Sequence, residues 1–354
     1  MLPIVALSIL IARADGATIA TAFPAGVIAT GTQGTTNPPA PTMGTPINQS
    51  SMARLLSLNS IDDWCVFAPP QRANISDTET EEVAWCTKPR NNARVIPDGT
   101  ITGLTFLKTP FYIQLMGVGN LTMLNIEAGD MGGELDPHGQ FGDGNPIGGN
   151  VTTNALDPAS DPVNIEEWML FISSAMFCIR ACTNANATYS AAQMCEARHK
   201  LDVMGCEFVM PGTYRAPGTF ETCDADVAYP PGWYPNVLPD GSTSFSKFAQ
   251  YFTGVYTGGD GQPTSYTVGD LITPTAPASV PSSSNCVTAF SIANGIPLTS
   301  LGVTGSMASA STSATKPSAT SAGTRVGKAG TGSEYAAIVL VSVVFGAAAV
   351  FLLH

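Results

Sequence analysis

The residue types most capable of chemistry are concentrated in one glycine-rich segment, residues 130–150. Carboxylate oxygens on a flexible glycine-rich backbone suit Ca²⁺, because this cation accepts irregular oxygen coordination. The spacing differs from that of an EF-hand, whose ligands occupy fixed alternate positions and end on a glutamate. A calcium site and a solvated surface loop are therefore both open interpretations, and a catalytic site is a third. The calcium candidates are Asp130, Glu134, Asp136 and Asp143, and His138 and Asn145 lie in the same segment.

Proton transfer near neutral pH has few candidate groups in this chain. Its three histidines are His138, His199 and His354, and histidine is the side chain whose ordinary pKa lies closest to 7. No G-x-S-x-G sequence is present to hold a serine nucleophile. The two carboxylates of a glycoside hydrolase come together only in the folded protein, so no local sequence pattern reveals them. We therefore predict no catalytic residues and no cofactor.

Aromatic rings offer a second kind of binding surface. Residues 229–235 read YPPGWYP, and the prolines stiffen the backbone that carries these rings. Such rings stack well on sugars, so carbohydrate binding is one interpretation. A proline-aromatic loop packed on the core is the other and the more ordinary one.

The cysteines indicate a disulfide framework. An even number in an exported chain favours disulfides over metal ligands, but eight cysteines allow 105 connectivities. We predict four disulfides, with Cys178 and Cys182 on one face and bonded to neighbouring elements rather than to each other. The eight are Cys65, Cys86, Cys178, Cys182, Cys195, Cys206, Cys223 and Cys286.

Both terminal segments predict export. Residues 2–12 are apolar and precede a small-x-small cleavage sequence, so we expect a signal peptide at 1–14; a buried first strand is the alternative. Residues 336–353 are apolar and follow small residues and a polar spacer. This pattern is typical of a glycosylphosphatidylinositol (GPI) signal, with attachment at Ser321 and a propeptide at 322–354; a single-pass membrane anchor is the alternative.

Five N-glycosylation sequons agree with export. Their acceptors are Asn48, Asn74, Asn120, Asn150 and Asn186. The net charge of −12, with 12% charged residues, argues against nucleic acid and anionic lipid as partners, because few cations are available to neutralise phosphates.

These groups must be positioned by a mainly β fold. Residues 15–58, rich in Thr, Pro and Gly, predict a disordered arm, and residues 59–272 predict a β-rich ectodomain, an antiparallel sandwich or roll. Two inserted helices are expected. One follows Asn164 with an apolar face over 165–179, and the other runs from Ser190 to about Lys200. Residues 273–321 predict a Ser/Thr/Pro-rich, O-glycosylated stalk.

Several long motifs resemble the fungal macrophage-activating glycoproteins. They are WCVFAPP at 64–70, AWCTKPRNNARVIPDG at 84–99, GGELDPHG at 132–139, FCIRAC at 177–182, DVMGCEFVMPGTY at 202–214 and AYPPGWY at 228–234. The resemblance covers residues 60–270, and a stalk and GPI-type tail are also typical of that family. It implies a fungal cell-surface or wall glycoprotein that is immunogenic to a host. It implies no catalytic residues.

We therefore predict a non-enzymatic glycoprotein held at the extracellular face of the plasma membrane or in the cell wall. Its expected partners are the outer leaflet, through a GPI lipid, and wall glucan. The alternative is a carbohydrate-binding or carbohydrate-active wall protein that uses segment 130–150 or 229–235 to bind a glycan.

Overall fold

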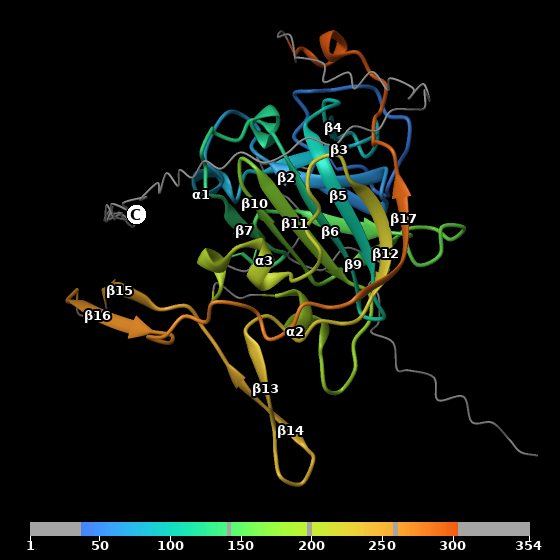
Figure 1. Cartoon of the computed structure of the whole chain (residues 1–354). Helices are drawn as coiled ribbons and strands as arrows, with labels where there is room; N and C mark the ends of the chain where they lie inside the picture. Colours follow the sequence, from blue (N-terminus) through green and yellow to red (C-terminus); the bar gives the residue numbers. More distant parts are fainter. Residues whose placement is uncertain (1–36, 140–142, 197–199, 258–260, 304–354) are drawn as a thin grey trace, which may run out of the picture. The chain divides into compact units, whose positions relative to one another are not determined.

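The strands of this chain form two large sheets and two separate hairpins. The computed structural model describes residues 37–139, 143–196, 200–257 and 261–303 (Figure 1). The mainly β prediction is confirmed, and short helices accompany the strands. The predicted signal peptide, Ser321 and the apolar tail at 336–353 lie outside the described residues.

The first sheet has six strands in the order β4-β3-β2-β1-β8-β9. Its pairs are antiparallel except β1–β8 and β3–β4, which are parallel. The strands are β1 (Leu55–Ser60), β2 (Asp63–Ala68), β3 (Val83–Cys86), β4 (Arg94–Val95), β8 (Asn150–Thr153) and β9 (Val163–Ile165).

The second sheet has seven strands in the order β17-β12-β5-β6-β11-β10-β7. One pair, β5–β12, is parallel. The strands are β5 (Ile101–Lys108), β6 (Tyr112–Gly119), β7 (Gly133–Leu135), β10 (Trp168–Ile172), β11 (Met176–Cys182), β12 (Phe220–Ala225) and β17 (Ser283–Ala289).

The main core lies between these two sheets. Trp64 of β2 stacks on Phe177 of β11 with ring centroids 5.1 Å apart, and Phe67 meets Trp168 of β10 at 5.5 Å. All four side chains belong to one buried cluster that includes residues of both sheets. The arrangement is therefore a sandwich, with aromatic contacts across the interface.

The other face of the seven-stranded sheet is also buried. Short helices and the loop around Phe248 cover it, and Met169, Phe171 and Cys178 point into this second cluster. The helical elements are α1 (Ile75–Thr78), η2 (Leu121–Leu124), α2 (Ala191–Cys195), η3 (Asp202–Met204), α3 (Cys206–Val209) and η4 (Leu298–Leu301). The hairpins are β13 (Trp233–Val237) with β14 (Thr243–Lys247), and β15 (Phe252–Thr257) with β16 (Pro263–Val268).

The predicted helix over 165–179 is wrong. Ile165 ends β9, and most of the other residues belong to β10 and β11, which pair antiparallel around a turn at Ser173. Both faces of the sheet are buried, so the strands are apolar at nearly every position. A continuous apolar run satisfies a helical period as readily as a strand period, which explains the error.

The second predicted helix is confirmed at its start and is shorter than predicted. Ser190 accepts a hydrogen bond from the Gln193 amide while the Gln193 side chain accepts one from the Ser190 amide, completing a capping box. The helix ends at Cys195 rather than near Lys200.

The ordered core extends beyond the predicted domain at both ends. β1 begins at Leu55, inside the segment expected to be a disordered arm, and its first four residues are buried. β17 occupies part of the predicted stalk and pairs with β12. Both corrections have one cause: a strand from each flanking segment completes a sheet, which composition does not reveal.

Four disulfides pair all eight cysteines. They join Cys65 to Cys86, Cys178 to Cys206, Cys182 to Cys195 and Cys223 to Cys286. Cys178 and Cys182 bond to neighbouring elements, as predicted, although they lie on a strand rather than a helix. Both share a face because the side-chain period of a strand is two.

Within the described ranges, none of the helices has the length and apolar character needed to cross a bilayer.

Candidate functional site

The four predicted calcium ligands do not form one site. Asp130 accepts hydrogen bonds from the amides of Ile75 and Gly132, at 3.1 and 3.2 Å. Asp136 accepts from the amides of His138 and Gly139, at 2.7 and 2.6 Å. Both carboxylates therefore stabilise turns and a helix start. Among the described residues, the close groups of metal-ligating side chains include none of Asp130, Glu134, Asp136 and Asp143.

Glu134 is buried on the face of the seven-stranded sheet that η3 and α3 cover. It is 2% exposed and lies opposite Phe171 in the register of β7 and β10. Burial raises its pKa well above the ordinary value, and the neighbouring Asp202 carboxyl and Asp136 add to this.

Glu82 is a second carboxyl whose burial raises its pKa well above the ordinary value. Its side chain accepts a 2.7 Å hydrogen bond from Thr78, which opposes the rise. Glu82 and Glu134 both belong to buried structure, so neither offers an accessible general acid.

His138 meets two glutamates that no sequence motif connects to it. Its Nε2 lies 3.0 Å from Glu167 Oε2, and ligand atoms of His138, Glu167 and Glu196 all lie within 4.8 Å of one another. The bond to Glu167 raises the pKa of His138, and the charges of Glu196 and Asp136 act in the same direction, while partial burial opposes them. The three side chains can act as an ion pair or bind a metal ion.

Separate elements hold these three residues. Asp136 fixes the backbone of His138 through the turn described above. The carbonyl of Glu167, just before β10, accepts from the Cys182 amide at 3.0 Å. Glu196 directly follows Cys195, whose disulfide to Cys182 holds it near β11. Both glutamates are therefore attached to Cys182, one through a backbone hydrogen bond and the other through a disulfide.

The sequence identified His138 but neither glutamate of this group. The disulfide between Cys182 and Cys195 is the signal that would have found Glu196, and its connectivity could not be deduced from spacing. His199, the other candidate base, lies outside the described residues.

The aromatic segment 229–235 packs into a cluster of its own. Phe245 of β14 contacts Trp233 at 5.3 Å and Tyr229 at 5.6 Å. The ammonium group of Lys247 lies 3.7 Å from the centroid of the Trp233 ring. Since Lys247 covers a face of this ring, the packing favours a structural role over sugar stacking.

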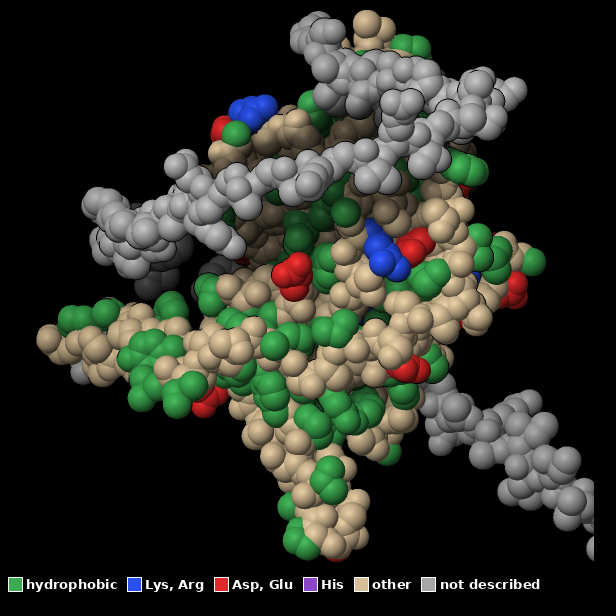
Figure 2. Space-filling model, in the orientation of Figure 1, with side chains coloured by type: hydrophobic (Ala, Val, Ile, Leu, Met, Phe, Trp, Pro, Cys, Tyr) green, Lys and Arg blue, Asp and Glu red, His purple; other side chains and the backbone are tan. Residues whose placement is uncertain are grey.

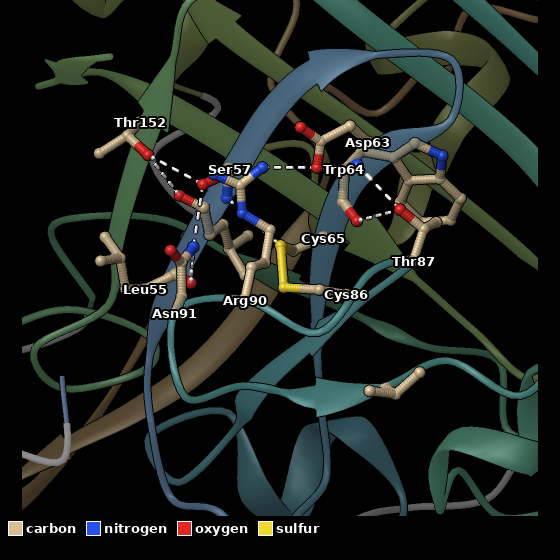
Figure 3. Close-up of a disulfide and its surroundings, with 12 residues drawn as sticks. Leu55, Ser57, Asp63, Trp64, Cys65, Cys86, Thr87, Arg90, Asn91 and Thr152 are labelled. Atoms are coloured by element: carbon tan, nitrogen blue, oxygen red, sulfur yellow. Dashed lines mark hydrogen bonds and ion pairs between the residues drawn. A yellow bond between two sulfur atoms is a disulfide. The ribbon is translucent and has the colours of Figure 1, made fainter. Parts of the chain in front are cut away.

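The most distinctive sequence motifs build the core instead of a catalytic centre. Figure 3 shows Cys65–Cys86 joining β2 to β3, with Arg90 paired to Asp63 beside it. Asn91 donates to the carbonyl of Leu55 at 3.1 Å and to Ser57 Oγ at 2.9 Å. Its backbone is left-handed, with φ of 54°, a conformation that asparagine tolerates better than most residues. The motif therefore ties a turn to β1.

The five sequons differ in accessibility. Asn74, Asn120 and Asn186 are exposed and Asn48 is half-buried. Asn150 is 4% exposed, begins β8, and donates its side-chain amide to the Gly148 carbonyl at 2.9 Å. A glycan needs this nitrogen and open space, so the structure argues against glycosylation of Asn150.

The described residues form an open groove lined by both polar and apolar side chains. It has a volume of about 610 Å³, lies between the α3 region and residues 274–280, and has Glu207 as the one carboxylate in its lining. Figure 2 shows few charged side chains on the displayed face and hydrophobic side chains along the β15–β16 hairpin, where Phe252 and Val268 are about half exposed.

The fold and these sites define a disulfide-bonded β-sandwich protein whose buried polar groups mainly support structure. The chain is 41% identical to appressorium protein ROW1 of Mycosarcoma maydis over 252 residues, which are 70% of this chain and 51% of ROW1. It is 39% identical to appressorium protein ROW2 of the same fungus over 201 residues, which are 54% of this chain and 67% of ROW2. The chain therefore belongs to the family of fungal proteins that contains ROW1 and ROW2.

The chain spans about half the length of ROW1. No family model matches it, and no solved structure matches it. The narrower resemblance to macrophage-activating glycoproteins stays a prediction.

Proposed function

We propose that this protein is a non-enzymatic glycoprotein of the fungal cell surface or cell wall, used at the appressorium. The observation that carries the proposal is the pairing of all eight cysteines in four disulfides. Such a framework forms in an oxidising compartment, which indicates passage through the secretory pathway. The appressorial setting is taken from the relatives, both of which are appressorium proteins.

The non-enzymatic part of the proposal is supported by the structural roles of the polar residues. The motif around Cys65 and Asn91 ties strands together, and Asp130 and Asp136 hold turns. The groove beside α3 has one carboxylate and no histidine in its lining. A disulfide-bonded fold whose polar groups hold strands and turns best supports the display of a stable surface.

The finer proposal is attachment through a GPI lipid at Ser321, with residues 273–321 as a glycosylated stalk and wall glucan as a second partner. It is supported by the small residues 321–323, the spacer and the apolar run 336–353. Immunogenicity to a host belongs to the same proposal, through the resemblance to macrophage-activating glycoproteins.

Phosphatidylinositol-specific phospholipase C treatment of intact protoplasts tests the anchor. We expect the protein to leave the cells in soluble form without residues 336–353, as mass spectrometry would show. A Ser321→Pro variant with Ala322 and Gly323 also replaced by proline should fail to attach. Retention of the wild type on the cells, with the apolar segment still detected, would contradict the GPI proposal but not the surface location.

A further inference from the structure

We propose that His138, Glu167 and Glu196 form a binding site for a divalent transition-metal ion, of which Zn²⁺ is the best match. The three side chains come from a turn, a strand start and a helix end that are distant in sequence. Their ligand atoms nevertheless converge to within 4.8 Å of one another.

The distances suit coordination. In a tetrahedral zinc site with bonds of 2.0–2.2 Å, two ligand atoms lie about 3.3 Å apart. His138 Nε2 and Glu167 Oε2 are 3.0 Å apart, so they need to separate by only a few tenths of an ångström. A metal ion would take the place of the proton that these two atoms share.

The ligand types select the class of metal. A neutral imidazole nitrogen with two carboxylates suits Zn²⁺ and similar ions, whereas Ca²⁺ and Mg²⁺ prefer oxygen ligands alone. With a neutral His138, the two glutamates supply two negative charges, and Asp136 adds further negative potential. A divalent cation therefore neutralises this group.

The surroundings hold the ligands and leave the site open. The Cys182–Cys195 disulfide and the bond from the Cys182 amide to the Glu167 carbonyl fix the two glutamates relative to β11. The His138 side chain is 46% exposed while that of Glu167 is 15% exposed. Water or an external ligand can thus complete the coordination, as in open zinc sites.

Metal titration of the whole secreted protein tests the site. The protein should carry no polyhistidine tag, keep its disulfides, and be stripped with a chelator before calorimetric titration with Zn²⁺ and spectroscopic titration with Co²⁺. We expect one ion per chain and an increase in Tm that grows with free Zn²⁺. His138→Ala and Glu196→Gln should each weaken binding about tenfold or more.

Glu166→Gln is the matched control. Glu166 is the exposed neighbour of Glu167, and this substitution removes one negative charge, as Glu196→Gln does. It should bind Zn²⁺ as the wild type does. Near-UV circular dichroism establishes whether each variant is folded. If His138→Ala does not fold, Glu196→Gln alone tests the site. Absence of saturable binding in the wild type, unchanged affinity in a folded site variant, or displacement of Zn²⁺ by equimolar Ca²⁺ would overturn the proposal.

Discussion

At the scale of single residues, burial changes what a charged side chain can do. Segment 130–150 looks like a cation-binding loop because it is rich in acids, yet its carboxylates have separate tasks. Asp130 and Asp136 accept backbone amides, while Glu134 is buried beside Asp202. Composition reveals that acids are near in sequence, but convergence in space depends on the faces to which β7 and its turns direct them.

The raised pKa of Glu134 predicts a pH dependence of stability. The unfolded chain releases this proton near the ordinary pKa, while the folded chain keeps it to higher pH. The stabilisation is therefore fully present below the ordinary pKa and is lost as pH rises through the folded pKa, with a slope of up to about 1.4 kcal/mol per pH unit.

Urea unfolding at pH 5 and pH 8 measures this effect. Glu134→Gln, which resembles the protonated acid, should gain stability relative to the wild type as pH rises. Glu127→Gln is the control, since the side chain of Glu127 is 44% exposed, and its difference from the wild type should stay nearly constant. A Glu134→Gln difference that does not change between the two pH values would contradict the assignment of Glu134 as a neutral buried acid.

At the scale of elements, the predictions succeeded where a local signal decides the structure. The capping box at Ser190 and Gln193 depends on four adjacent residues and is confirmed. The prediction for residues 168–182 was wrong because the sheet is buried on both faces. Its strands therefore lack the alternation of apolar and polar residues that marks a half-exposed strand. The site at His138 could be predicted only in part. Glu196 is held near it by a disulfide whose pairing the spacing does not reveal, and Glu167 precedes β10, a strand that the sequence predicts as a helix.

The edge strand β17 predicts an element-scale effect of the Cys223–Cys286 disulfide. β17 pairs with β12 alone, and its side chains are mostly exposed, so few apolar contacts hold it. The disulfide links residues 63 apart in sequence. A Cys223→Ala/Cys286→Ala variant should lose about 2–4 kcal/mol of stability and should expose β17 before the sandwich unfolds.

Hydrogen exchange followed by mass spectrometry resolves this local opening. Amides of 283–289 should exchange faster in the double variant, while those of β10 and β11 in the core keep their protection. The Cys65→Ala/Cys86→Ala variant is the comparison, because that disulfide lies in the main core and its loss should affect the whole sandwich. Equal protection of β17 with and without its disulfide would show that strand pairing alone holds it.

At the scale of the whole molecule, glycans should report which parts of the surface are open. A secreted display protein gains solubility from its glycans only where the folded chain leaves the acceptor asparagines accessible. Asn74, Asn120 and Asn186 satisfy this condition, and Asn150 lies inside the pairing of β1 with β8. We expect glycopeptide mass spectrometry of the secreted protein to find glycans at the exposed acceptors and an unmodified Asn150.

Substitution separates the structural role of Asn150 from the role of the exposed acceptors. Asn120→Gln should lower the mass by one glycan and leave Tm nearly unchanged, because that side chain lies at the surface. Asn150→Gln should leave the glycan mass unchanged and lower Tm, because a longer side chain cannot fit the buried position and keep its bond to the Gly148 carbonyl. A glycan on Asn150 in folded protein would mean that β8 does not pair with β1 as the structure has it.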